Sequence, residues 1–223
     1  MGFIKPKGYS PDEFRQFVGM LKFSAWKPKF ITLHNTAEPS LAQWHNGFTS
    51  YIKSGKLQRA GIDPAKTSPA AMQYYYEEWR CSNLNDYYQH QLRWHAGPHL
   101  FISPSYIWNT CDLTRSGVHC SCFNSLSIGI EMVGDYGTEP FTTGDGVQVR
   151  ALTIEALAIL HNRLQISPLP YKVGALGLHA HKACVRDHHD CPGKHVDMDD
   201  MRRCVMNMMK EYNGKELQHG NAA

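Results

Sequence analysis

The pattern of apolar and polar residues predicts an alternation of strands and helices along most of the chain. Strands are indicated where β-prone or apolar residues run together, and helices where apolar residues recur behind a capping residue such as Ser10 or Thr153. The strands expected are 29–36, 99–102, 106–110 and 127–134, with another apolar stretch over 173–178; the helices expected are 11–21, 39–55, 68–79, 153–164 and 197–212. No long linker divides this alternation, so we expect one α/β domain over residues 1–223, with a loop over 55–68 and a frayed tail over 213–223.

Two of the expected strands carry polar side chains that a buried strand would normally exclude. The first strand runs directly into His34-Asn35-Thr36, and the ends of such strands are where ligands collect in α/β sheets. Glu131 interrupts the apolar run of a second strand, and a carboxylate is costly to bury unless it is paired or has a task. A histidine satisfied within the core, and a glutamate bound by backbone or arginine, are the alternatives at these two positions.

The segment Leu178–Lys194 contains four of the thirteen histidines of the chain, at positions 179, 181, 188 and 189. It also contains two cysteines, Cys184 and Cys191, and imidazole and thiolate are the usual protein ligands of zinc. The segment therefore indicates a metal site if a distant histidine joins it, and a solvated histidine-rich loop if none does.

Composition limits the compartment and the partners. The 223 residues carry a net charge of +3, and no apolar run approaches the roughly 18 residues that suggest a membrane span. The N-terminus lacks the apolar core of a secretory signal, so we expect a protein that is cytoplasmic as synthesised. Residues 1–60 hold nine basic against three acidic residues, a balance of +6, but no nucleic-acid-binding motif accompanies them, so we expect no nucleic-acid partner.

The cysteine count favours reduced thiols. Seven cysteines are an odd number in a chain without an export signal, which makes a reducing compartment the default. Cys120 and Cys122 form a C-x-C without a second pair, so we interpret them as structural residues.

Four motifs stand in order along the chain: L-H-N-T at the end of the first strand, H-L-F-I, G-V-H-C-S-C-F-N-S-L-S-I-G-I-E-M-V-G, and H-x9-C-P-G. Together they resemble the zinc-dependent N-acetylmuramoyl-L-alanine amidases, a superfamily that also contains peptidoglycan recognition proteins and phage endolysins. The resemblance covers roughly residues 30–197. It implies a central mixed β-sheet flanked by helices, one zinc ion, and hydrolysis of the amide bond between N-acetylmuramic acid and L-alanine in a peptidoglycan or muropeptide substrate.

The resemblance also implies a set of metal ligands. His34 corresponds to the first zinc ligand, His181 to the second and Cys191 to the third, and three protein ligands leave a fourth position for water, as in catalytic zinc sites. His179 and His188 are close enough in sequence to compete with His181, which is preferred only for its spacing to Cys191.

Further roles follow from the same resemblance. Glu131 matches the strand glutamate that orients or deprotonates the attacking water, and His189 stands where many relatives place a lysine or threonine that stabilises the oxyanion. His119 and Asn124 match a segment that lines the cleft, and Asn35 is a further candidate for substrate binding.

The chain departs from its relatives at two positions, His189 and Pro98. Pro98 stands where some relatives have a tyrosine, so no tyrosine role is transferred.

Three functions compete. We favour a cell-wall amidase of phage or prophage origin, an endolysin that would reach the wall after release. A cytoplasmic amidase that recycles muropeptides is the second interpretation. A non-catalytic peptidoglycan-binding module is the third, and Cys191 argues against it because inactive recognition proteins typically lack that ligand.

Overall fold

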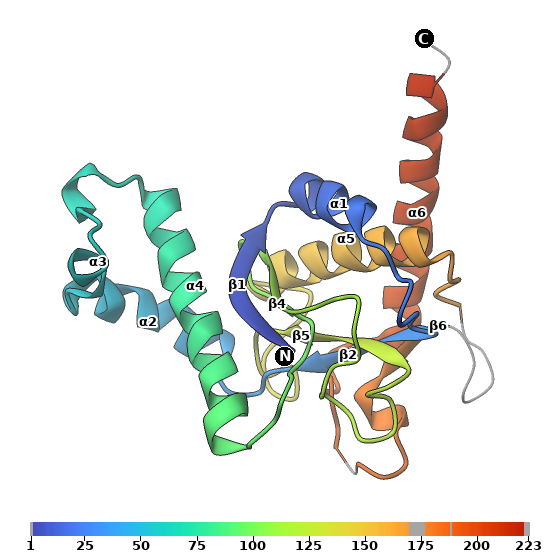
Figure 1. Ribbon diagram of the computed structural model, residues 1–223, viewed down its shortest axis with the longest axis horizontal. Coiled ribbons are helices and arrows are strands. Elements are labelled where there is room, and N and C mark those ends of the chain that lie inside the picture. The colour runs from blue at the N-terminus through green and yellow to red at the C-terminus, as the bar shows by residue number, and fades with distance from the viewer. Residues whose placement is uncertain (1, 170–176, 188, 221–223) are drawn as a thin grey trace.

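A six-stranded mixed sheet forms the centre of the computed structural model, which describes residues 2–169, 177–187 and 189–220. The strand order is β1-β4-β3-β5-β2-β6, with antiparallel pairing of β4 to β1 and β3 and parallel pairing among β3, β5, β2 and β6. The strands are β1 (Phe3–Tyr9), β2 (Phe30–Asn35), β3 (Leu100–Ile102), β4 (Ile107–Cys111), β5 (Ser127–Met132) and β6 (Gly177–Ala180). Helices flank this sheet, so the predicted α/β fold with a mixed sheet is confirmed (Figure 1).

The helices begin where serine side chains can cap them. Ser10, Ser40 and Ser68 each accept a hydrogen bond from the backbone three residues later, which satisfies a free N–H at the start of α1, α2 and α4. The main helices are α1 (Pro11–Met20), α2 (Leu41–Lys53), α3 (Lys56–Arg59), α4 (Pro69–Asp86), α5 (Gly146–Leu164) and α6 (Met198–Gly220). Single turns lie at Pro64–Lys66, Tyr87–Gln91 and His181–Ala183. No helix among the described residues is both long and apolar enough to cross a bilayer.

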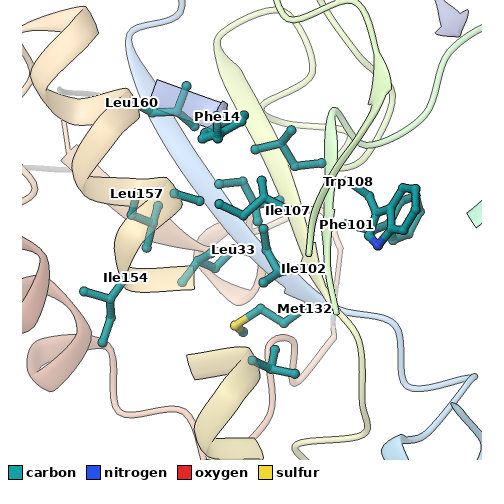
Figure 2. Close-up of a cluster of buried hydrophobic side chains, with 14 of the residues drawn as sticks. Phe14, Leu33, Phe101, Ile102, Ile107, Trp108, Met132, Ile154, Leu157 and Leu160 are labelled. Carbon is teal, nitrogen blue, oxygen red and sulfur yellow. The ribbon is translucent and has the colours of Figure 1, made fainter. Parts of the chain in front are cut away.

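The two faces of the sheet have different tasks because side chains alternate along each strand. Leu33, Ile102 and Met132 lie toward α5, where they pack with Leu157 and Leu160 in the main core (Figure 2). Phe101 and Trp108 lie on the other face, and α4 covers the part of that face formed by β1 and β4. The rest of this second face, over β5, β2 and β6, carries the polar residues of the candidate site.

Three helices differ in length from the prediction. Thr153 does not cap α5: the helix begins at Gly146, and the buried Thr153 hydroxyl donates to the Val149 carbonyl within it, 2.7 Å away. Helix α4 runs to Asp86, beyond the predicted end at residue 79, and continues into a π-helical turn. Helix α6 continues to Gly220, so the frayed tail predicted from residue 213 is wrong for the described residues up to that point.

Two further segments differ from the prediction. Strand β1 was not expected, because Lys5, Pro6 and Lys7 hide its apolar alternation. Among the described strands it lies at the edge of the sheet and pairs with β4 alone. The loop expected over 55–68 contains α3 and a short helical turn. Most of the apolar stretch over 173–178 lies outside the described residues, and β6 begins at Gly177.

A buried carboxylate joins α4 to the hairpin of β3 and β4. Glu77 is fully buried; it accepts hydrogen bonds from the Trp108 indole at 3.1 Å and from the Ser103 hydroxyl. Gln73 donates a third bond at 2.8 Å. A buried donor left without a partner costs about 1–3 kcal/mol. The hydrogen bonds of Glu77 therefore contribute more to the free energy of unfolding than a contact on the surface does.

We expect Glu77→Ala to lower the free energy of unfolding by about 3 kcal/mol, because it removes the buried acceptor that the Trp108 indole and the Ser103 hydroxyl share and leaves only their longer contacts. Urea denaturation measures this loss. Glu78→Ala is the matched control: its partner Lys5 is 82% exposed, so the change should stay within about 1 kcal/mol. Equal losses in the two variants would show that the Glu77 contacts have no special role.

Candidate metal centre

Three predicted ligands lie together at one end of the sheet. His34 is at the end of β2, His181 follows β6, which pairs with β2, and Cys191 lies in the loop that leads to α6. One ring nitrogen of each histidine and the Cys191 Sγ lie within 4.8 Å of one another. The backbone N–H of Asn35 donates to that sulfur at 3.3 Å.

A series of hydrogen bonds determines which ring nitrogen carries the proton in His119 and in His34. The His119 Nε2 lies 3.2 Å from the Ser127 carbonyl oxygen, which can only accept, so His119 carries its proton on Nε2. Burial lowers the pKa of His119 to about 3, so its ring is neutral and Nδ1 is an acceptor. The His34 Nε2 lies 3.0 Å from this Nδ1 and must be the donor, which leaves the His34 Nδ1 with a free lone pair.

The His181 ring is oriented in the same sense. Its Nε2 lies 3.2 Å from the Asp187 carboxylate, which makes Nε2 the donor and leaves Nδ1 with a lone pair. Burial alone would raise the pKa of Asp187, but hydrogen bonds from Ser121 and His181 lower it to about 2. Asp187 therefore remains a carboxylate at neutral pH and holds the ring in place.

The two free lone pairs face each other. The Nδ1 atoms of His34 and His181 are 3.1 Å apart, and each is an acceptor in the tautomer that its other hydrogen bond requires. Burial, with the neighbouring His119 and His181 rings, holds the pKa of His34 well below its ordinary value, so a proton shared between the two rings is disfavoured. Two lone pairs with a thiol beside them are satisfied by a cation, and two imidazoles and a thiolate suit zinc. The residues present therefore fit the ion that the sequence implies.

The surroundings of Cys191 favour the protonated thiol, and a bound cation would favour the thiolate. Burial, and then the Glu131 carboxyl, raise the pKa of Cys191, so the sulfur stays protonated unless a metal displaces the proton. Gly193 fixes the turn after it: its φ is 101°, and a Cβ there would meet the Tyr136 backbone at 2.3 Å.

Glu131 lies beside this centre on the neighbouring strand. It pairs with His34 in the register of β5 and β2, so both side chains project from the same face of the sheet. Burial raises the pKa of Glu131 to about 8. A nearby cation would favour the carboxylate instead, because an opposite charge stabilises the ionised form.

The other predicted site residues have different surroundings. His119 is buried beside His34, and Gly129 allows this, because a Cβ there would lie 2.3 Å from the His119 ring. Asn124 shapes the same loop: its Oδ1 accepts from the backbone N–H groups of His119 and Cys120, at 2.7 and 2.8 Å. The Asn35 side chain donates to the Gly134 carbonyl at 3.3 Å.

The remaining histidines of the loop divide into three cases. His189 is exposed, and its ring centroid lies 5.3 Å from that of His181 at the edge of the site. His179 is buried on β6, with its ring 4.1 Å from that of Phe30, and is not among the three clustered donors. His188, the other competitor, lies outside the described residues.

A disulfide holds together the two loops that surround the centre. Cys122 and Cys184 are bonded across a separation of 62 residues, which ties the segment of His119 to the segment of His181. The expectation of reduced thiols is wrong for Cys122 and Cys184, whereas Cys120 is a free, buried thiol. Cys120 also lies within 4.8 Å of ligand atoms of His181 and Asp187, but Asp187 is engaged by the backbone and hydroxyl of Ser121 at 2.9 and 2.7 Å.

Two residues near the centre were missed in the sequence. Asp187 gave only the weak signal of an acid within a histidine-rich loop. Tyr88 belongs to the π-helical turn after α4, where its ring stacks on Trp94 and Phe101 at centroid distances of 5.0 and 6.3 Å. Burial raises the pKa of Tyr88, and Glu131 and Cys191 add to the rise, so its hydroxyl is within electrostatic reach of the site. The sequence pattern around Tyr88 did not predict this π-helical turn.

Comparison with known families agrees with this architecture. The model of the N-acetylmuramoyl-L-alanine amidase family, Amidase_2, matches residues 24–194, which include His34, His181 and Cys191. The chain therefore belongs to this family. No curated protein sequence matches the chain.

Solved structures share the fold at low sequence identity. The N-acetylmuramoyl-L-alanine amidase LysC from Clostridium intestinale is 16% identical over 82% of this chain and 87% of its own, with a TM-score of 0.50. The hydrolase AmiA from Staphylococcus aureus, solved with its ligand, is 14% identical over 96% of this chain and 97% of its own, with a TM-score of 0.50. Drosophila PGRP-LB is 16% identical over 77% of this chain and 84% of its own, with a TM-score of 0.48.

We expect Asp187→Asn to weaken zinc affinity by about 10- to 100-fold, because the amide no longer provides the charged acceptor that orients His181. Competition with a chromophoric chelator measures the affinity. Asp63→Asn is the matched control, because Asp63 lies before the turn Pro64–Lys66 and forms its ion pair with the exposed Lys66. If Asp187→Asn binds zinc as tightly as the unchanged protein, Asp187 does not hold the ligand.

Proposed function

We propose that this protein is a zinc-dependent N-acetylmuramoyl-L-alanine amidase that hydrolyses the bond between N-acetylmuramic acid and the L-alanine of the stem peptide. The observation that carries the proposal is the pair of unprotonated imidazole nitrogens 3.1 Å apart beside a cysteine thiol. Family membership supplies the reaction. The preferred setting is that of a phage or prophage endolysin, and the excess of basic residues in the first 60 positions suits an anionic wall.

The proposed ligands are His34, His181 and Cys191. Zinc, when bound, lowers the pKa of a water toward about 7 and polarises a carbonyl oxygen. The hydrogen bonds of His119 and Asp187 keep both histidine rings in the tautomer that binds a cation, and the Asn35 N–H donates to the Cys191 sulfur. These contacts hold the donors in place before a substrate arrives.

Glu131 is the proposed proton carrier. As a carboxylate it accepts a proton from the attacking water, and as the acid it delivers that proton to the amine of L-alanine as the amide bond breaks. Its buried position favours the protonated state once the proton has been taken up, which suits the second half of this transfer. His189 at the edge of the site is the proposed cation that stabilises the oxyanion.

Digestion of purified bacterial walls tests the proposal. We expect the zinc-loaded protein to release new L-alanine amino termini, and we expect exhaustive chelation to abolish this release. Glu131→Gln should keep the fold and the zinc but lose about 10²–10⁴ in rate, because it cannot accept the proton. Glu78→Gln, on the outer side of α4, is the control and should retain full activity. Unchanged turnover by a zinc-loaded Glu131→Gln protein would contradict the assignment.

The same assay separates the endolysin from a muropeptide-recycling amidase. An endolysin cleaves intact walls, whereas a recycling enzyme prefers soluble anhydro-muropeptides. Preference for the soluble substrate would replace the endolysin setting while leaving the chemistry unchanged. Zinc binding without cleavage of either substrate would favour a non-catalytic binding module.

We expect His189→Ala to lose turnover while retaining zinc, and His189→Lys to retain turnover, because lysine restores a cation at the same edge of the site. Zinc content and turnover should be measured on the same preparations. Loss of zinc in the alanine variant would instead make His189 a ligand. Normal zinc and normal turnover would make it a surface residue of the loop.

A further inference from the structure

A second cavity, of about 520 Å³, lies between α1, α5 and α6. It is separate from the metal centre: α5 packs on the Leu33 face of the sheet, whereas His34, the next residue, projects from the opposite face. Apolar side chains, including Val18, Ile159 and Met209, form part of its wall. Neither the sequence motifs nor the proposed reaction uses this cavity.

Three residues that line the cavity have buried polar atoms without a hydrogen-bond partner. These atoms are the Nε of Arg15, the Nε2 of His161 and the hydroxyl of Tyr212, which come from three different helices. A buried polar group without a partner is costly, so three around one cavity indicate that something other than the protein satisfies them. The bland explanation is ordered water.

The hydrogen bonds of His161 decide what kind of group it needs. Its Nδ1 lies 2.9 Å from the Ile166 carbonyl oxygen, so Nδ1 carries the proton. Burial lowers the pKa of His161 to about 4, so the ring is neutral and Nε2 is an acceptor that requires a donor such as a hydroxyl.

Arg15 and Tyr212 supply the complementary groups. The Arg15 guanidinium lies 4.1 Å from the centre of the Tyr212 ring, and its NH1 is held by Asp12 at 2.8 Å, so the unpaired Nε is fixed in position. The cation and this N–H favour an anionic acceptor, and the Tyr212 hydroxyl can donate to it as well. Arg163 adds a second positive charge to the lining.

We propose that this cavity binds a hydroxylated carboxylate, with a hydroxyl donating to His161 and the carboxylate accepting from Arg15 and Tyr212. Two sources share this chemistry, a free hydroxy acid and a sugar acid. The sugar acid is favoured by volume, because a hydroxy acid of lactate size would leave most of the cavity unfilled. The choice of N-acetylmuramic acid as the probe rests on the proposed function, since amidase cleavage leaves its lactyl carboxylate free on the glycan.

Titration of the full-length protein tests the proposal. The probes are N-acetylmuramic acid, D-lactate, and N-acetylglucosamine, which has hydroxyls but no carboxylate; the readout is the labelled methyl resonance of Met209 in the cavity wall. We expect N-acetylmuramic acid to shift this resonance and N-acetylglucosamine to do so at least about tenfold more weakly. D-lactate binding as tightly as the sugar acid would support the carboxylate class and identify the free hydroxy acid as the source. Equal binding of N-acetylglucosamine, or no binding of either carboxylate, would overturn the proposal and leave ordered water as the occupant.

Tyr212→Phe is the decisive variant, because its hydroxyl makes no bond within the protein and its removal should leave stability unchanged. We expect it to weaken binding about three- to tenfold, the effect of one lost hydrogen bond. Tyr75→Phe, on α4 and outside the cavity lining, is the matched control and should bind normally. Arg15→Lys keeps the charge but loses Nε, and it should weaken binding further than Tyr212→Phe. Binding that is unaffected by either cavity variant would place the probe elsewhere.

The titration is independent of catalysis. His34→Ala and Glu131→Gln, which disable the proposed active site, should bind N-acetylmuramic acid in the cavity as the unchanged protein does. If the unchanged protein binds N-acetylmuramic acid in the cavity but cleaves no wall, the proposed function is wrong and the proposed cavity site stands. Cleavage without cavity binding would do the reverse.

Discussion

The candidate centre depends on one chain of directed hydrogen bonds. It begins at the Ser127 carbonyl, passes through His119 to His34, and ends with a free lone pair on the His34 Nδ1. Each link follows from the one before it, because a carbonyl oxygen accepts only and a neutral imidazole has a single proton. Asp187 imposes the corresponding state on His181 from the other side. The two acceptors that result lie 3.1 Å apart, and the proposed zinc site rests on this pair.

The sheet makes this series of hydrogen bonds possible because its two faces differ, one apolar and the other polar. One face packs against α5 and supplies the apolar core, while the other brings His34 and Glu131 into register on adjacent parallel strands. Residues without side-chain bulk matter on the second face, because Gly129 leaves room for the His119 ring. The proposed ligands outside the sheet, His181 and Cys191, lie after β6, and the Cys122–Cys184 bond ties the segment of His181 to that of His119. A rigid strand end and a stapled loop thus bring together donors that are far apart in the sequence.

The helices on the other side of the sheet from the candidate site surround a cavity with unpaired polar atoms. Helices α1, α5 and α6 pack around a cavity in which His161, Arg15 and Tyr212 retain unpaired polar atoms. No periodicity predicts such a cavity, because its polar atoms come from three separate helices and are each unremarkable in sequence. His161 in particular has the sequence context of an ordinary core residue, and only its hydrogen bond to Ile166 shows which nitrogen is free.

The sequence alone determined strands β2, β3, β4 and β5, the start of α1 behind Ser10, and the family, because these depend on local periodicity, a capping residue and short motifs. It also indicated His34, His181, Cys191 and Glu131 as residues of one site, and their assigned roles remain predictions. The tertiary structure decided what depends on distant partners. It placed His119 beside His34, assigned Asp187 to His181 and paired Cys122 with Cys184. Edge strand β1 and the early start of α5 also escaped prediction, because pairing and burial outweighed their local composition.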